Sequence, residues 1–235
     1  MIVLQTFRSG PEPCPYLPAE LSTMEHILVV QLSATEYEAK MNEGWRKFGP
    51  VLFRPVCESC HACQPLRIPV AEFTPSRSQR RALAKNTELI VRRARPTVDA
   101  QRLALYNRYH TEREAARGWS ESDKSEEDYA FSFLRSSVPA VELSVWEGER
   151  LLAIVLTDIT PNAVSGVYHY YEPECERRSI GTFAMLQTIT LAHELGKPWA
   201  YFGYWVAACP SLAYKANFQP CEILTERKCW EPHKP

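Results

Sequence analysis

The sequence lacks an excess of charge of either sign, and it lacks a long hydrophobic run. Its 235 residues include 27 Lys and Arg against 28 Asp and Glu, which gives a formal net charge of −1. Overall charge therefore provides no argument for a nucleic-acid partner, and only a local basic patch can provide one. The longest apolar run near the middle, residues 151–156, is far too short to span a bilayer.

The first residues lack the basic segment and long apolar stretch of a secretory signal, so we expect a cytoplasmic protein with no membrane partner. Its eight cysteines then lie in a reducing compartment, where four disulfides are not expected. Free thiols, a metal site or an iron–sulfur cluster are the alternatives. The composition, 45% hydrophobic and 23% charged, is that of a globular protein with a sizeable core.

Three cysteines at three-residue spacing, Cys57, Cys60 and Cys63, form the most informative motif. Overlapping C-x2-C pairs can direct soft thiolate ligands at one zinc ion or one iron–sulfur cluster. A tetrahedral site needs a fourth ligand, for which Cys14 is the best candidate. The alternative is a set of reduced thiols that pack around a turn. The other four cysteines are scattered, and we expect them to be structural.

A basic stretch follows the cysteines. Residues 77–95 contain seven basic side chains and a single acidic one. Ser76 is a candidate N-cap for a helix that carries Arg77, Arg80 and Arg81. Such a helix can simply present a solvated face, or it can contact phosphates; we favour phosphate contact.

The order of predicted elements indicates an α+β fold in two parts. Residues 1–97 are rich in Pro, Arg and Cys, and the remainder, 98–235, has clearer periodicity. In the first part we expect a helix within 32–48 and a strand at 51–54. In the second part the pattern predicts a helix at 98–117, strands at 141–146, 151–157 and 164–171, a helix at 180–195, and a strand at 199–204. We therefore expect a smaller Cys- and Arg-rich domain, followed by a larger α+β domain.

The residues that open the expected helix at 180–195 nearly match a phosphate-binding loop. Arg178, Ser179 and Gly181 fit the R-x-x-G-x-G/A loop of acyl-CoA N-acyltransferases (the GNAT fold), whose backbone amides hold a pyrophosphate at a helix N-terminus. The last small residue of that loop is Phe183 here, and a bulky ring should obstruct a pyrophosphate. We therefore expect the GNAT-like architecture without coenzyme A.

Several motifs occur in one order between about residue 12 and residue 230, and together they resemble those of the bacterial aspartate/glutamate leucyltransferases, relatives of the eukaryotic arginyl-tRNA–protein transferases. The motifs are Cys14-Pro-Tyr-Leu-Pro18, residues 54–70, residues 73–81, Tyr170-Tyr-Glu-Pro173, residues 178–181, Gly203-Tyr-Trp205 and Tyr214-Lys215. Eukaryotic relatives carry C-x-x-C where this chain has Cys14 followed by Leu17, so one expected thiol is absent.

The resemblance implies an aminoacyltransferase that moves leucine from Leu-tRNA to the α-amine of proteins beginning with Asp or Glu. The product is then degraded through an N-degron pathway. It also implies a C-terminal GNAT-like domain that uses tRNA in place of coenzyme A, so the chemistry requires no cofactor. Arginyl-tRNA as donor, an acetyl-CoA-dependent N-acetyltransferase, and a non-catalytic nucleic-acid-binding protein are the alternatives.

An aminoacyl ester is already activated, so the enzyme needs an unprotonated amine at the ester carbonyl and a stabilised oxyanion. Tyr170 and Glu172 are our candidate bases, and Lys215 is expected to bind the oxyanion or the terminal ribose and phosphate. One of Arg67, Arg80 and Arg81 is expected to clamp the acceptor carboxylate as a fork donor. The expected substrate-binding residues are Arg67, Arg77, Arg80, Arg81, Arg178, Ser179, Gly181, Tyr204, Trp205 and Tyr214.

Overall fold

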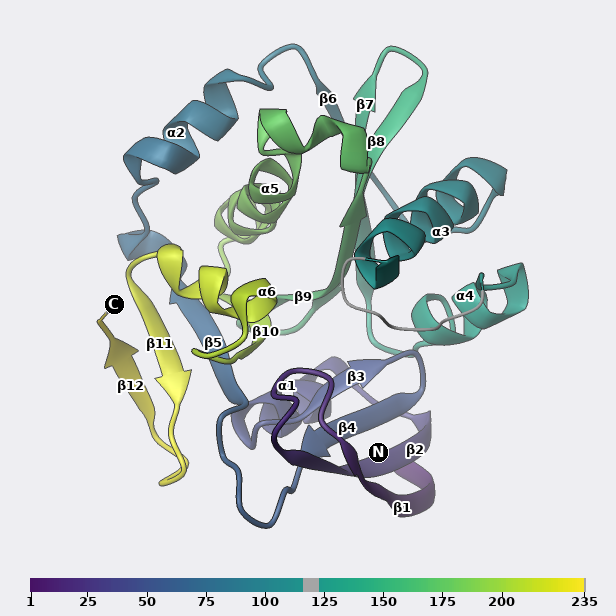
Figure 1. Ribbon diagram of the computed structural model, residues 1–235, viewed down its shortest axis with the longest axis vertical. Coiled ribbons are helices and arrows are strands. Elements are labelled where there is room, and N and C mark those ends of the chain that lie inside the picture. Colours follow the sequence, from purple (N-terminus) through teal and green to yellow (C-terminus); the bar gives the residue numbers. More distant parts are fainter. Residues whose placement is uncertain (116–122, 235) are drawn as a thin grey trace.

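The computed structural model describes residues 1–115 and 123–234, and within them the chain forms two β-sheets with helices packed around them (Figure 1). The end of the helix expected at 98–117, and the start of the polar segment after it, lie outside the described residues. No helix in the described part is long and apolar enough to cross a membrane.

The first sheet has four antiparallel strands in the order β1-β2-β4-β3 within the described chain. Its strands are β1 (Ile2–Pro13), β2 (Leu21–Gln31), β3 (Arg46–Phe48) and β4 (Val51–Pro55). Helix α1 (Ala34–Asn42) connects β2 to β3, and the Ser33 hydroxyl caps it by accepting a hydrogen bond from the Glu36 backbone N–H. Gly44 takes a positive φ of 94° just after this helix, where the sequence predicted its end.

The second sheet has eight described strands in the order β12-β11-β5-β10-β9-β8-β7-β6. They are β5 (Gln64–Pro69), β6 (Ile90–Ala94), β7 (Ala140–Glu147), β8 (Arg150–Ile159), β9 (Ala163–Tyr171), β10 (Trp199–Trp205), β11 (Cys221–Leu224) and β12 (Trp230–His233). β9 and β10 pair in parallel, and helix α5 (Ile180–Glu194) makes the crossover between them. The mixed sheet with this crossover confirms the α+β, GNAT-like fold expected for the C-terminal part.

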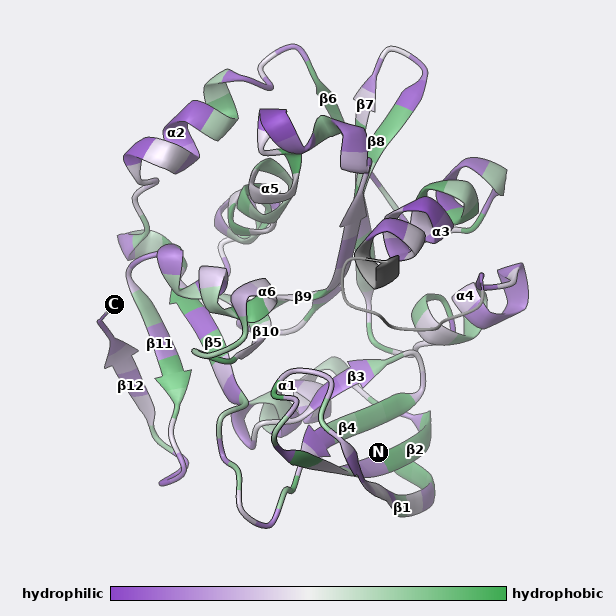
Figure 2. Ribbon diagram, in the orientation of Figure 1, coloured by the Kyte–Doolittle hydropathy of each residue, from purple (hydrophilic) through white to green (hydrophobic). Residues whose placement is uncertain are grey.

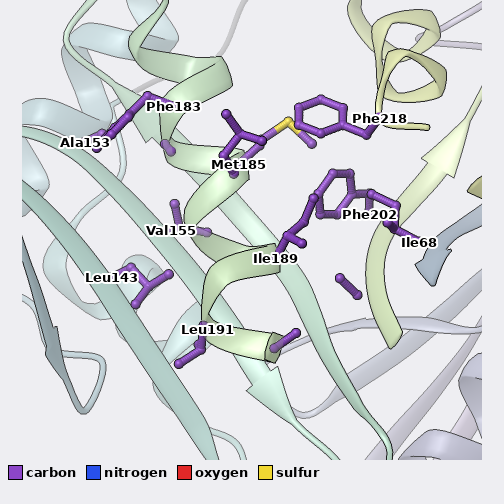
Figure 3. Packing of buried hydrophobic residues seen from close by; sticks show 14 of the residues in the cluster. Ile68, Leu143, Ala153, Val155, Phe183, Met185, Ile189, Leu191, Phe202 and Phe218 are labelled. Carbon is purple, nitrogen blue, oxygen red and sulfur yellow. The ribbon is translucent and has the colours of Figure 1, made fainter. Parts of the chain in front are cut away.

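Helices cover both faces of the large sheet (Figure 1). α5 packs on β8 and β9 from one side, with α2 (Arg77–Ala84) against it, and α3 (Ala100–Ala115) packs on the same strands from the other. Nine of the fifteen residues of α5 are buried, and Met185 and Ile189 pack among sheet residues such as Val155 (Figure 3). By contrast, α2 presents hydrophilic residues over much of its surface (Figure 2). The remaining helical segments are α4 (Glu126–Phe133), α6 (Pro210–Ala213) and the 3-10 turns η1 (Val70–Glu72), η2 (Pro173–Arg178) and η3 (Tyr214–Asn217).

The boundary between the sheets does not coincide with the expected domain boundary at residue 97. β5, α2 and β6 all fall within 1–97, yet β5 pairs with β10 and β11, and β6 pairs with β7 at the far edge of the large sheet. The segment after the cysteine motif thus leaves the small sheet and runs across the large one. Strands β1 and β2 were not predicted, because β1 is exposed and contains two prolines.

β9 and β10 separate after a short paired stretch. Their pairing covers Ala163 to Ser165 and Trp199 to Tyr201, after which β10 continues alongside β5. Gly203 takes a positive φ of 73° at the register shift in β10. Residues other than Gly rarely adopt this backbone conformation. The strands therefore diverge at the end of the sheet that lies against the small sheet.

Candidate active site

A cavity of about 520 Å³ lies where β9 and β10 diverge. Its walls come from β3 and β4 of the small sheet, from β9 and β10, from the first turns of α5, and from α6 and η3. The described side chains that line it include Arg46, Lys47, His169 and Lys215, and none of them is Asp or Glu. A concave site of this size and charge is suited to an anionic or carbonyl-containing ligand.

Lys215 lies on η3 with its Nζ inside the protein. The ammonium donates a hydrogen bond to the Tyr204 backbone oxygen at 2.8 Å. Burial, and next the positive charge of Arg46, lower the pKa of Lys215 to about 7. A substantial fraction of this lysine is therefore neutral at physiological pH, which is the state that can accept a proton.

Tyr214 precedes Lys215 and also lines the cavity. Its hydroxyl oxygen lies 3.4 Å from His169 Nε2, and it donates to Met185 Sδ at 3.1 Å. Tyr214 and Lys215, which the sequence analysis assigned to the substrate site, both line the cavity, and His169 lines it beside Tyr214. His169 lay within a predicted strand and was missed because nothing local indicates which face a strand residue takes.

The start of α5 does not resemble an open pyrophosphate cradle. Ser179 takes a positive φ of 58° and makes no side-chain cap, and a Cβ at Gly181 would lie 2.6 Å from Tyr171 Cε1. Tyr171 therefore fills the space beside Gly181. The reason given for excluding a pyrophosphate was wrong in one respect: Phe183 points into the core, 6% exposed (Figure 3), and the obstructing ring is Tyr171.

Arg46 and Lys47 are buried side by side at the start of β3. Lys47 forms an ion pair with buried Asp158 of β8 at 2.9 Å, which connects the two sheets. Arg46 Nη1 donates to the Trp45 backbone oxygen at 2.6 Å. These contacts could not be predicted from the sequence, because basic residues in a short strand ordinarily face solvent.

Two residues expected as bases lie away from the cavity. Neighbouring residues of a strand face opposite sides, so Tyr170 points toward α3 and α4 while Tyr171 reaches the cavity. The Tyr170 hydroxyl lies 2.7 Å from that of Tyr129, and burial raises its pKa well above the usual range. Glu172 is buried in an ion pair with Arg108 at 2.9 Å. Both residues have structural partners here, so we do not retain them in the proposed catalytic set.

Two arginines expected to bind substrate are also held by carboxylates. Arg67 pairs with Glu222 at 2.7 Å, and its guanidinium carbon lies 3.6 Å from the centre of the Trp199 ring. Arg178 pairs with Glu147 at 2.7 Å and also with Glu88. Neither arginine lines the cavity. Each is held outside it by its ion pairs with these carboxylates.

The other expected substrate residues divide between the cavity and the surface. Tyr204 lines the cavity, whereas Trp205 does not; its Nε1 donates to the Ala213 backbone oxygen at 3.2 Å. The three arginines of α2 are exposed: Arg77, Arg80 and Arg81. Ser76 caps this helix as predicted, in a reciprocal capping box with Gln79.

The four candidate cysteine ligands border a second cavity, also of about 520 Å³, which shares Tyr204 with the first. All four are free thiols: Cys14, Cys57, Cys60 and Cys63. Burial, and then the other three thiols, raise the pKa of Cys63 to about 12. Their chemistry suits zinc or an iron–sulfur cluster, but no three His, Cys, Asp or Glu side chains of the described residues are arranged around a common point.

Comparison with protein families identifies the chain. Residues 12–81 match the arginine-tRNA-protein transferase N-terminus and residues 101–225 match its C-terminus. The chain belongs to the arginine-tRNA-protein transferase family. It is therefore an aminoacyltransferase whose donor is an aminoacyl-tRNA, and the resemblance inferred from the motif order is confirmed.

Relatives within this family match almost the whole chain. The aspartate/glutamate leucyltransferase of Pseudomonas fluorescens (strain Pf0-1) is 36% identical over 227 residues, 96% of this chain and 95% of that protein. The protein of the same name from Halorhodospira halophila (strain DSM 244 / SL1) is 36% identical over 215 residues, 91% of each chain.

Among solved structures, the likeness is confined to a weak overall correspondence. FemX covers 72% of this chain and 60% of its own, with a TM-score of 0.46 and 11% identity. L-PGS from Bacillus licheniformis covers 73% of this chain and 50% of its own, with a TM-score of 0.43 and 15% identity.

The close approach of Tyr171 to Gly181 predicts a specific pattern in a double-mutant cycle. Gly181→Ala should destabilise the protein by about 1–3 kcal/mol, because the added methyl group overlaps the ring. In a Tyr171→Ala background the same change should stabilise it by up to about 1 kcal/mol, since Ala favours a helix over Gly. Urea unfolding measures both values, and an equal cost in the two backgrounds would contradict the packing described here.

Proposed function

We propose that this protein transfers leucine from Leu-tRNA to the α-amine of proteins whose first residue is Asp or Glu. The observation that carries the proposal is the cavity between β9 and β10, which is lined by four basic side chains and, among the described residues, by no carboxylate, and which contains a lysine whose pKa is about 7. The names of the most similar relatives specify leucine as the donor group and Asp or Glu as the acceptor. The reaction then marks the acceptor for degradation in the cytoplasm.

The proposed chemistry is a direct aminolysis of the ester. Lys215 in its neutral form removes a proton from the acceptor α-amine, whose own pKa is about 8. The amine nitrogen then forms a bond with the leucyl carbonyl carbon, and the bond from that carbon to the terminal ribose oxygen breaks. The departing ribose oxygen takes up the proton that the attacking nitrogen loses as the amide forms, and the tRNA leaves with a free hydroxyl. The Tyr214 hydroxyl is placed to donate to the oxyanion that forms in between.

The exposed arginines of α2 support contact with the tRNA backbone. Gln79 Nε2 donates to the Asn217 backbone oxygen at 3.1 Å, which fixes α2 beside η3 and hence beside Lys215. Arg77, Arg80 and Arg81 therefore lie on the outer side of the segment that lines the cavity. Phosphates of the acceptor end bound there would direct the charged ribose inward.

A transfer assay tests this function. The protein is incubated with Leu-tRNA carrying labelled leucine and with peptides beginning with Asp, Glu or Ala. We expect label on the α-amine of the Asp and Glu peptides, without ATP or acetyl-CoA, since the ester supplies the activation. Arg-tRNA serves as the competing donor. Transfer from Arg-tRNA alone, or from acetyl-CoA alone, would contradict the proposal.

The pKa of Lys215 predicts a pH dependence. Because it is lowered to about 7, the neutral base becomes more abundant as pH rises through 7, and kcat/KM should rise with it. Lys215→Met should lower kcat/KM about a hundredfold or more and remove this inflection. Lys197→Met is the control, since Lys197 Nζ donates to the Pro161 backbone oxygen and Lys197 does not line the cavity. An unchanged inflection near pH 7 in Lys215→Met would exclude Lys215 as the base.

We further propose that the transfer step needs no cofactor, and that the four clustered cysteines hold one zinc ion or one iron–sulfur cluster with a structural role. Protein purified without oxygen should then contain about one such site per chain. Cys60→Ser should release the metal and lower the melting temperature, whereas Cys229→Ser, at an exposed cysteine, should do neither. Elemental analysis that finds neither zinc nor iron would instead favour reduced thiols that pack around the turn.

A further inference from the structure

Arg46 is a buried cation, and two of its guanidinium nitrogens have no hydrogen-bond partner among the described residues. Its side chain lines the main cavity, and the residue is 5% exposed. Nη1 donates to the Trp45 backbone oxygen, and the guanidinium lies between the Tyr201 and Tyr204 rings, 5.4 and 5.6 Å from their centres. Nε and Nη2 are buried too, and neither has a hydrogen-bond partner within residues 1–115 and 123–234. A buried charge left in this state is costly, so it requires an explanation.

The two unpaired nitrogens lie on the edge of the guanidinium that suits a carboxylate. Nε–H and one Nη2–H point in the same direction, and their spacing matches that of two carboxylate oxygens. Two other arginines of this protein hold a carboxylate on that edge, each through one oxygen. Nε and Nη2 of Arg54 lie 2.8 and 2.7 Å from Glu25 Oε2, and those of Arg67 lie at the same two distances from Glu222 Oε2.

The other cations of the cavity are already engaged. Lys47 is paired with Asp158, and Lys215 donates to a backbone oxygen and has a lowered pKa. No described Asp or Glu lines the cavity, so the protein itself offers Arg46 no carboxylate there. A ligand that carries a carboxylate can supply the partner that the described residues do not.

We infer that the Nε and Nη2 edge of Arg46 binds the side-chain carboxylate of the acceptor's first residue. This inference rests on the proposed function and names the group that selects Asp and Glu. It replaces the sequence-based expectation that Arg67, Arg80 or Arg81 does so, because Arg67 is held by Glu222 and the other two are exposed on α2.

The location explains how selection and reaction are joined. Arg46 and Lys215 line the same cavity and both contact Tyr204: the guanidinium carbon lies 5.6 Å from the centre of its ring, and the lysine Nζ donates to its backbone oxygen at 2.8 Å. In an N-terminal Asp or Glu the carboxylate and the α-amine are separated by only a few bonds. A carboxylate on Arg46 thus leaves the α-amine beside Lys215. An amide in its place would offer one oxygen and turn an N–H₂ group toward a donor, which explains the rejection of Asn and Gln.

The experiment measures kcat/KM for peptides beginning with Asp and with Asn, with Leu-tRNA as donor. We expect Arg46→Gln to lower the Asp-to-Asn ratio about a hundredfold. Both rates come from one preparation, so the ratio does not depend on the fraction of protein that folds. Arg46→Lys keeps the charge but not the fork, and should lower the ratio to a smaller extent. Arg54→Gln is the matched control and should leave the ratio unchanged, because Glu25 occupies its fork.

Two outcomes of this assay would overturn the inference. One is an unchanged Asp-to-Asn ratio in Arg46→Gln. The other is an equal loss of both rates together with weaker Leu-tRNA binding, which would assign Arg46 to the tRNA. Wild-type protein that transfers leucine to no peptide would instead contradict the proposed function. Calorimetric titration with the Asp peptide then decides: weaker binding to Arg46→Gln than to wild type supports the inference, and equal or absent binding overturns it.

Discussion

The divergence of β9 and β10 is the constraint on which the site depends. Parallel pairing lasts for three residues of each strand, and the register of β10 against β5 then shifts at Gly203. Every functional element meets at the resulting gap: the start of α5, the segment that carries Lys215, and the β3 strand of the small sheet. The small sheet therefore does more than cover the large one, because it supplies two of the cations that line the cavity.

Burying these cations carries a large desolvation free energy, and contacts within the protein offset only part of it. Lys47 has a buried carboxylate partner in Asp158, whereas Arg46 has backbone and ring contacts and Lys215 a single backbone oxygen. Burial without a counter-charge is also what moves the pKa of Lys215 to about 7. Uncompensated charge of this kind is typical of a site that binds an anion or transfers a proton. Its burial lowers the stability of the folded protein.

Local signals in the sequence predicted much of the fold. The helix at 180–195, its end at Gly196 and the cap at Ser76 were correct, because each rests on periodicity or on chemistry within a few residues. The site was harder to predict. A strand residue changes face with its neighbour, so Tyr170 was chosen where His169 and Tyr171 reach the cavity. The pairing of Arg67 with Glu222 could not be predicted either, because the two residues lie 155 positions apart in the sequence.

A crystal structure with a bound peptide that begins with Asp would show which side chain holds the acceptor carboxylate. We predict that this carboxylate lies within hydrogen-bonding distance of both Nε and Nη2 of Arg46, with the α-amine facing Lys215 Nζ. A peptide whose carboxylate lies on the α2 arginines, or anywhere outside the cavity between β9 and β10, would contradict this prediction.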